Sequence, residues 1–202
     1  MDAHQLTEND IIHSLADRPS RPPINPFPAE MLSGPPRPAA VLIPFIRQDD
    51  AWHILFIRRT TMKQDPHSGQ VAFPGGRCDP EDPTPETAAL REAQEEVGLQ
   101  PADVRILGRL EDFVTITNYQ ITPIIGRIPW PYPLQKAPEE VSRAFTIPLD
   151  WLADSSNRET LTREMPEGFP AQQVIYFKAY DNEILWGASA RIMLNLLEAL
   201  HI

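Results

Sequence analysis

Prolines are concentrated in one segment of this chain, and that segment cannot form a regular helix or a central strand. Residues 19–38 hold eight of the 23 prolines. Proline fixes φ and has no backbone N–H to donate, so the segment is predicted to be an extended connector. Together with a short helix expected over residues 5–16, it makes residues 1–38 an N-terminal arm, which we expect to lie over the core or over a second subunit.

The pattern changes at residue 39, where apolar and branched residues begin. Residues 39–46 and 53–59 are two apolar runs separated by a polar turn, which predicts a β-hairpin. Four further strands are expected, the last of which runs into a short helix: 69–73, 104–110, 119–128 and 139–153. The first of these should end at a Pro-Gly-Gly turn, and Pro123 should break the strand at 119–128.

One more strand, at 174–180, and two helices, at 85–98 and 187–200, complete the expected elements. Strands on both sides of a helix, followed by a closing helix, predict an α/β fold in which one sheet lies between helices. The length of 202 residues suits one domain, which we place at residues 39–202.

The overall charge limits the class of partner. A net charge of -10 and a pI near 4.9 argue against nucleic acid, because phosphate contacts need clustered Lys and Arg. A small anionic substrate remains compatible if a bound cation neutralises it. The chain shows neither a secretory signal nor an apolar run of about 20 residues, so we expect a cytoplasmic protein without a membrane partner.

The helix expected at 85–98 has well-defined ends and carries an unusual charge pattern. Thr84 suits the N-cap, Pro85 the first helical position and Gly98 the C-terminal stop. Positions i, i+3 and i+4 share a helix face. The apolar residues should therefore pack against the sheet: Leu90, Ala93 and Val97.

The same periodicity gathers three glutamates of the helix, Glu92, Glu95 and Glu96, into one acidic patch beside Arg91. Three carboxylates on one rigid element suit Mg²⁺ or Mn²⁺, which prefer oxygen ligands. A solvated acidic surface is the alternative interpretation of these residues alone. The Gly-Gly turn upstream favours a phosphate-and-metal site, because glycine lets the backbone approach a ligand closely.

Residues 76–99 resemble the Nudix box of the Nudix hydrolases, G-x5-E-x7-R-E-U-x-E-E-x-G-U, in which U is apolar. Every fixed position of the second half matches: Arg91, Glu92, Ala93, Glu95, Glu96, Gly98 and Leu99. The first half is one residue longer than the usual form. Gly76 then supplies the glycine, and either Glu81 or Asp82 stands at the early acid.

The upstream segment GQVAFPGG, residues 69–76, resembles the coenzyme A pyrophosphatase branch of this family. The branch also has an arginine four residues before the first glycine, where this chain has Asp65, and Lys63 is a possible substitute. The resemblance implies an α/β/α sandwich with a central mixed β-sheet. It also implies hydrolysis of coenzyme A or its derivatives to 3′,5′-ADP and 4′-phosphopantetheine, or the acyl form.

The resemblance also implies roles for individual residues. Mg²⁺ or Mn²⁺ would be held by Glu92, Glu95 and Glu96. The expected catalytic residues are those three with Arg91, which could orient a carboxylate, and Glu140. The general base is either one of the helix glutamates or a carboxylate from a distal loop, for which Glu140 is our candidate. The expected substrate-binding residues are Arg59, Gly69, Phe73, Gly75 and Gly76.

Two other functions remain open from the sequence. One is a Nudix diphosphatase for a different nucleoside diphosphate derivative, such as ADP-ribose or a dinucleotide. The other is a Nudix-fold binding domain without catalysis, which the three retained helix glutamates disfavour. In each case we expect a small nucleotide-containing ligand, and the N-terminal arm makes a homodimer plausible.

Overall fold

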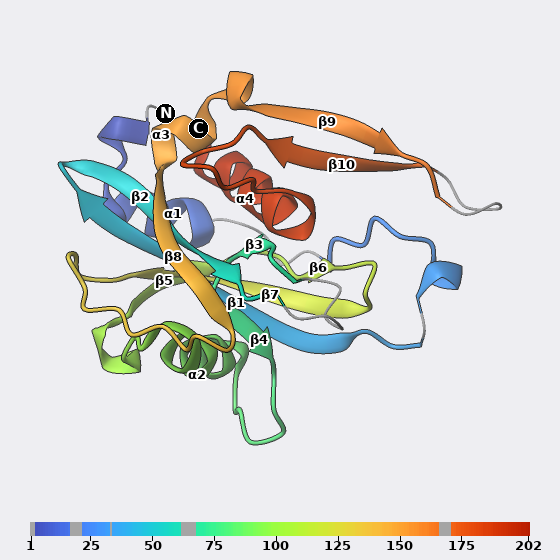
Figure 1. The fold of residues 1–202 in the computed structure, drawn as a ribbon, viewed down its shortest axis with the longest axis horizontal. Helices are drawn as coiled ribbons and strands as arrows, with labels where there is room; N and C mark the ends of the chain where they lie inside the picture. The colour runs from blue at the N-terminus through green and yellow to red at the C-terminus, as the bar shows by residue number, and fades with distance from the viewer. Residues whose placement is uncertain (1–2, 17–21, 33, 62–67, 166–170) are drawn as a thin grey trace.

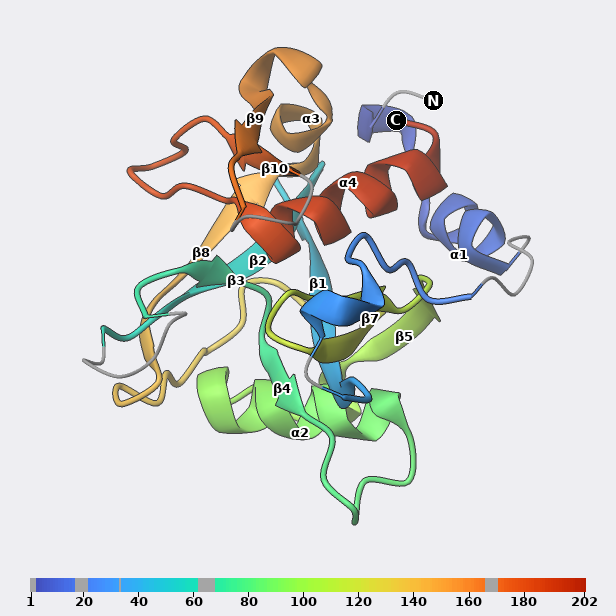
Figure 2. The ribbon, with the colours of Figure 1, turned by 90° about the vertical axis from the view of Figure 1, so that its right-hand side faces the viewer.

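The computed structural model describes residues 3–16, 22–32, 34–61, 68–165 and 171–202, which form an α/β/α arrangement around a mixed sheet (Figure 1). Helix α2 (Pro85–Val97) covers one face of the sheet, and α1 (Glu8–Ala16) and α4 (Gly187–Leu200) lie on the other (Figure 2). The short helix α3 (Leu149–Ala153) follows the last strand of the sheet. The predicted fold class is confirmed.

The main sheet has eight strands: β1 (Arg37–Gln48), β2 (Ala51–Arg59), β3 (Val71–Ala72), β4 (Gly75–Arg77), β5 (Arg105–Arg109), β6 (Phe113–Val114), β7 (Tyr119–Arg127) and β8 (Val141–Pro148). Strands β1 and β2 form the predicted antiparallel hairpin. The sheet is mixed because β1 also pairs with β7 in parallel. A separate two-stranded ribbon consists of β9 (Arg158–Arg163) and β10 (Gln172–Phe177).

Alternate residues of β1 supply the two halves of the apolar core. Ile43 and Phe45 point toward α1 and α4, whereas Ala40 and Leu42 point toward α2. This alternation is the period of two that a strand buried on both faces must satisfy. Strand β1 is therefore the central element against which both helical layers are positioned.

Strand β7 runs unbroken through Pro123, so the predicted break at this residue is wrong. Pro123 lies opposite Val41 in the parallel ladder with β1. Its carbonyl faces the other side and accepts a hydrogen bond from the Leu110 N–H at 3.0 Å, just past the end of β5. The missing proline N–H therefore removes no ladder hydrogen bond at this position.

The strand predicted at 69–73 is shorter than expected, and the Pro-Gly-Gly turn that should follow it contains the start of a second short strand. Strand β3 pairs with β2, and β4, which was expected to be a turn, pairs with β1. The change of partner depends on Gly75, whose φ is 151°. A Cβ at this residue would lie 2.4 Å from the Ala40 carbonyl oxygen, so only glycine fits there.

Strand β9 was not predicted, because its residues do not alternate between apolar and polar in the way that signals a strand. Most of its side chains are exposed. It forms through its ladder with β10 rather than through burial of its own side chains. No helix in the described part of the chain is long and apolar enough to cross a membrane.

The N-terminal residues pack onto the core. Leu6, Ile11 and Leu15 are buried in the apolar cluster on the α4 side of the sheet. The Trp52 indole N–H on β2 donates to the Leu6 carbonyl at 2.6 Å. Farther along, Ile24 forms a bridge with Phe113 of β6, so the proline-rich connector also lies against the sheet.

Because Ile11 is completely buried, replacing it with alanine should destabilise the whole domain rather than only the arm. We expect Ile11→Ala to lower the free energy of unfolding by about 2–4 kcal/mol, measured by urea denaturation. His13→Ala is the matched control, because His13 is on the same helix but exposed. If both variants unfold like the parent chain, helix α1 is not part of the cooperative core.

Candidate functional site

Helix α2 is held in place by both of its ends and by its apolar face. The Thr84 hydroxyl accepts a hydrogen bond from the Thr87 N–H at 3.2 Å, and Pro85 begins the helix. Gly98 ends it with a φ of 72°, and its N–H reaches the carbonyls of the last turn. The predicted apolar face is confirmed, since Ala93 and Val97 are buried against the sheet and Leu90 packs beside them.

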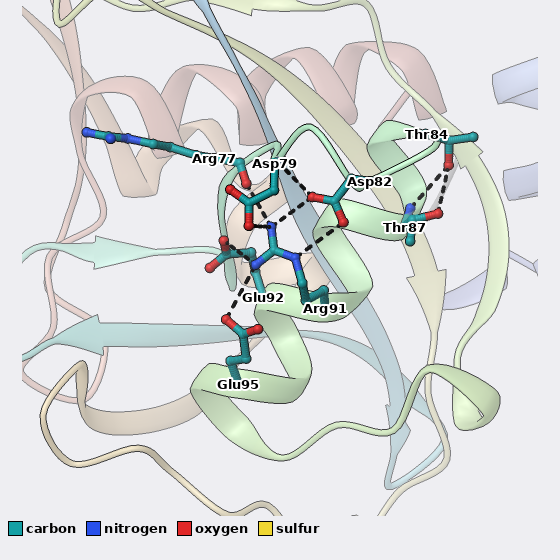
Figure 3. Close-up of polar contacts among 8 residues, drawn as sticks. All are labelled: Arg77, Asp79, Asp82, Thr84, Thr87, Arg91, Glu92 and Glu95. Carbon is teal, nitrogen blue, oxygen red and sulfur yellow. Dashed lines mark hydrogen bonds and ion pairs between the residues drawn. The ribbon is translucent and has the colours of Figure 1, made fainter.

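Arg91 organises the loop that precedes the helix (Figure 3). Its Nε and Nη2 donate to the two carboxylate oxygens of Asp82, at 3.2 and 2.9 Å, and Nη2 also donates to the Arg77 carbonyl at 2.9 Å. Asp79 lies 3.6 Å away. The pKa of Asp82 is lowered, chiefly because it accepts this paired hydrogen bond.

This geometry distinguishes the two candidates for the early acid. Asp82, and not Glu81, holds Arg91, while Glu81 is exposed. The extra residue in the loop therefore leaves an acid in contact with Arg91. The Arg77 carbonyl and Asp79 were not predicted as partners of Arg91, and a backbone acceptor leaves no signal in the sequence.

Arg91 also holds two of the helix glutamates. Its Nη1 donates to Glu92 at 2.9 Å and to Glu95 at 3.4 Å (Figure 3). The Glu95 side chain is 57% exposed, whereas that of Glu92 is only 16% exposed. Burial raises the pKa of Glu92 even though its bond to Arg91 acts in the opposite direction.

Glu96 is the most deeply buried carboxylate of the site. Its side chain is 1% exposed, its Oε2 accepts a hydrogen bond from the Gly75 N–H at 2.9 Å, and Arg59 Nη1 lies 3.6 Å from Oε1. Burial raises its pKa to about 8, although the Gly75 N–H and Arg59 both act to lower it. The site thus holds a carboxylate whose negative charge is poorly compensated.

The glycines of β4 allow the helix and the sheet to approach closely. A Cβ at Gly76 would lie 2.5 Å from the carboxyl carbon of Glu92, so the absent side chain makes room for this carboxylate. Gly75, next to it, supplies the N–H to Glu96. Two carboxylates from α2 therefore lie directly against the backbone of β4.

The three predicted metal ligands do not yet converge. Glu92 and Glu96 lie toward β4, whereas the exposed Glu95 contacts Arg91. In the described part of the chain, no three carboxylate, histidine or cysteine side chains gather as a ready metal cage. The donors still fit a hard dication, because all of them are carboxylate oxygens. Burial also disfavours the negative charge of Glu92 and Glu96, which a nearby cation would stabilise.

The other predicted site residues fall in three places. Glu140 is exposed, and its charge contributes to the raised pKa of both Glu92 and Glu96, which places it close to the pair. Gly69 precedes β3 with a φ of 70°.

Phe73 is buried and packs on Phe56 with ring centres 4.9 Å apart, so in this structure it is a core residue rather than a ligand surface. The residues at 63 and 65 lie outside the described residues: Lys63 and Asp65.

Comparison with known proteins identifies relatives of the whole domain. A family model of the NUDIX domain matches residues 35–169. Two proteins described as uncharacterized Nudix hydrolase NudL are each 37% identical to this chain over 166 residues, covering 82% of it and 81% of the relative. They come from Yersinia pestis (strain Pestoides F) and Yersinia pseudotuberculosis serotype O:1b (strain IP 31758).

One solved structure supports the fold alone. It is a MutT/nudix family protein from Enterococcus faecalis, which superposes with a TM-score of 0.53 at 13% identity. The match covers 82% of this chain and 62% of that one.

The choice between Asp82 and Glu81 can be tested with a matched pair of variants. Asp82→Asn should lower the free energy of unfolding by about 1–2 kcal/mol, because it removes the charged acceptor of Arg91. Glu81→Gln, at the neighbouring exposed position, should be nearly neutral. Urea denaturation of both variants is the measurement, and equal effects would show that Arg91 does not depend on Asp82.

Glu96 should give the metal-free protein a distinctive pH dependence. Its carboxyl stays protonated in the folded state up to about pH 8 but ionises near 4.5 in the unfolded chain. The free energy of unfolding should therefore fall as pH rises between these values. In Glu96→Gln this fall should be smaller by at least about 1 kcal/mol, measured by urea denaturation in EDTA at pH 5 and 8.

Glu86→Gln is the control, because Glu86 is on the same helix and, among the described residues, pairs only with Arg109, at 3.8 Å. This control should keep the pH dependence of the parent chain. An unchanged pH dependence in Glu96→Gln would mean that Glu96 is ionised in the folded protein at neutral pH.

Proposed function

The chain belongs to the Nudix hydrolase family, and we propose that it hydrolyses the diphosphate bond of coenzyme A or its derivatives with the help of Mg²⁺ or Mn²⁺. The observation that carries the proposal is the placement of Glu92 and Glu96 against the glycine backbone of β4. Carboxylate oxygens held together on rigid elements suit a substrate that arrives as a metal-bound diphosphate.

Three glutamates would hold the metal. Glu92 and Glu96 already lie together, and Glu95, one helix turn from Arg91, is the third ligand. When bound, the metal would neutralise the diphosphate and lower the pKa of a coordinated water. Such neutralisation would favour an anionic substrate on a chain whose net charge is -10.

Arg91 has a positioning role in this proposal. It ties Asp82 of the loop to Glu92 and Glu95 of the helix, so the carboxylates start from a fixed arrangement. Its pKa is raised, chiefly by the hydrogen bond to Asp82, so it stays charged at any working pH. The absent side chain at Gly76 leaves Glu92 directly against the backbone of β4, which holds this carboxylate on the same side as Arg91.

Glu140 is the proposed general base. It is exposed at the start of β8 and lies close enough to Glu92 and Glu96 to influence the pKa of both. It would take a proton from the attacking water as the water oxygen bonds to phosphorus. The bond from that phosphorus to the bridging oxygen then breaks, which gives 3′,5′-ADP and 4′-phosphopantetheine.

The substrate class rests on sequence as well as geometry. The GQVAFPGG segment, which resembles the coenzyme A branch, forms β3, the buried Phe73 and the glycines of β4. A different nucleoside diphosphate derivative, such as ADP-ribose, would use the same carboxylates and is the natural comparison substrate. A binding domain without catalysis is disfavoured, since all three glutamates are kept.

We expect the purified chain to convert coenzyme A to 3′,5′-ADP and 4′-phosphopantetheine in Mn²⁺ or Mg²⁺, with products identified by mass. Replacement by glutamine of any one of Glu92, Glu95 or Glu96 should lower kcat by at least about a hundredfold, because each removes a charged metal ligand. Glu140→Gln should lower kcat by about 10²–10⁴ without weakening Mn²⁺ binding.

Glu86→Gln, on the first turn of the same helix, should keep full activity. Cleavage of ADP-ribose but not of coenzyme A would retain the chemistry and reject the substrate. Failure to cleave either compound would favour a binding domain.

A further inference from the structure

Two arginines and a tyrosine form a cationic cluster at the end of β4 that the proposed chemistry does not use. The guanidinium carbon of Arg37 lies 4.1 Å from the centre of the Tyr119 ring, and that of Arg77 lies 5.6 Å from it. The Arg77 Nε–H also donates to the Tyr119 hydroxyl at 2.9 Å. We call these three residues the arginine–tyrosine cluster.

Strand register brings the cluster together from three separate strands. Arg37 of β1 lies opposite Tyr119 of β7, and Arg77 of β4 lies opposite Ala39 of β1. Because side chains alternate between the faces of a sheet, all three members project from the same face. Both arginines are exposed and Tyr119 is half-buried, so the ring positions the guanidinium groups at the surface.

The cluster has no compensating acid among the described residues. Arg59 and Arg91 each face a carboxylate of the candidate site, but no carboxylate in the described part of the chain pairs with Arg37 or Arg77. Arg37 Nη2 donates to the Thr117 carbonyl at 3.1 Å. Apart from this bond and that of Arg77 Nε, their guanidinium donors meet no partner in the described segments.

Two neighbouring cations repel each other, and a bound anion would relieve that repulsion. Among the described residues, no ion pair with a carboxylate neutralises either guanidinium, although the chain carries a net charge of -10. A guanidinium presents donors in a planar fork that matches the oxygens of a phosphate. The cluster therefore suits an anion that offers several oxygens, such as a phosphate group.

The cluster is next to the carboxylates that would act on the diphosphate. Successive residues of β4 carry both: Gly75 and Gly76 contact Glu96 and Glu92, and Arg77 follows them. The Arg77 carbonyl accepts from Arg91, while its side chain extends away from Arg91 (Figure 3). Among the described strands, β4 pairs only with β1, and its Gly75 N–H donates to Glu96 instead of to a further strand.

We propose that the arginine–tyrosine cluster binds the 3′-phosphate of the substrate, and thereby selects diphosphates that carry a second phosphate on the ribose. This inference rests on the proposed function, because coenzyme A has its 3′-phosphate one sugar away from the diphosphate. With the diphosphate at Glu92 and Glu96, the ribose would lie beside β4, at the edge that does not pair with β1. Its 3′-phosphate then meets the donors of Arg37 and Arg77.

The test compares coenzyme A with dephospho-coenzyme A, which lacks only the 3′-phosphate. The parent chain should have a kcat/KM at least about tenfold higher for coenzyme A, as expected for a charge-assisted phosphate contact. Arg77→Gln should lower kcat/KM for coenzyme A by about tenfold or more and leave that for dephospho-coenzyme A within about twofold. Arg37→Gln should act in the same direction, and Arg77→Lys should keep part of the preference because it keeps the charge.

Arg47→Gln is the matched control, since Arg47 is also on β1 and also lies over an aromatic ring, that of Trp52 at 4.8 Å. It belongs to neither site and should change neither rate constant. Equal kcat/KM values for the two substrates in the parent chain would overturn the inference. So would an Arg77→Gln variant that loses both activities equally, because Arg77 would then support the fold or the diphosphate.

Binding of product analogues separates this inference from the proposed function. By isothermal titration calorimetry, 3′,5′-ADP should bind at least about tenfold more tightly than AMP, and Arg77→Gln should remove the difference. If the chain cleaves neither coenzyme but shows this Arg77-dependent difference, the phosphate site stands and the proposed reaction fails. If it cleaves coenzyme A but binds both nucleotides equally, the reaction stands and the phosphate site fails.

Discussion

The close approach of helix α2 to strand β4 is the constraint on which the candidate site depends. Two adjacent glycines make it possible, because a side chain at Gly75 would strike the backbone of β1 and one at Gly76 would strike Glu92. The approach places the Gly75 N–H against Glu96, a carboxylate with almost no access to solvent. Core packing of the opposite face of α2 holds this arrangement, so the reactive groups sit on rigid elements rather than on a loop.

The carboxylates at this contact are paired unequally with positive groups. Arg91 pairs with Asp82, Glu92 and Glu95. In the described part of the chain, Glu96 has only the Gly75 N–H and the longer contact to Arg59. The consequence is a raised pKa at Glu96, because desolvation outweighs those two favourable contacts. If a dication bound there, as proposed, it would supply the missing positive charge, and folding and metal binding would be linked through the same carboxylate.

Features that depend on local chemistry were predictable from the sequence. The ends of α2 follow from Thr84, Pro85 and Gly98, and its buried face follows from the spacing of small and apolar residues. The β1–β2 hairpin follows from two apolar runs and a polar turn. Each signal lies within a few residues of the feature that it predicts, which is why these predictions are confirmed.

Features that depend on pairing between distant strands were not predictable. Whether Pro123 breaks β7 depends on which of its sides carries a partner, and the apolar pattern does not contain that information. The same holds for β9, which exists through its ladder with β10. In the site, the sequence limited the early acid to Glu81 or Asp82, and only the path of the loop selects Asp82.

The arginine–tyrosine cluster, in its proposed role, depends on the same strand register as the candidate site. Arg37 and Tyr119 are neighbours only because β1 and β7 run in parallel, and Arg77 joins them only because β4 pairs with β1. Strand β4 thus presents opposite charges on its two faces, carboxylates from α2 on one and guanidinium groups on the other. In the proposal, a ligand beside β4 would be bound at two places. A metal on the carboxylates would hold the diphosphate, and Arg37 and Arg77 would bind the phosphate one sugar away. Discrimination between substrates could then change through Arg37 or Arg77 without disturbing the carboxylates.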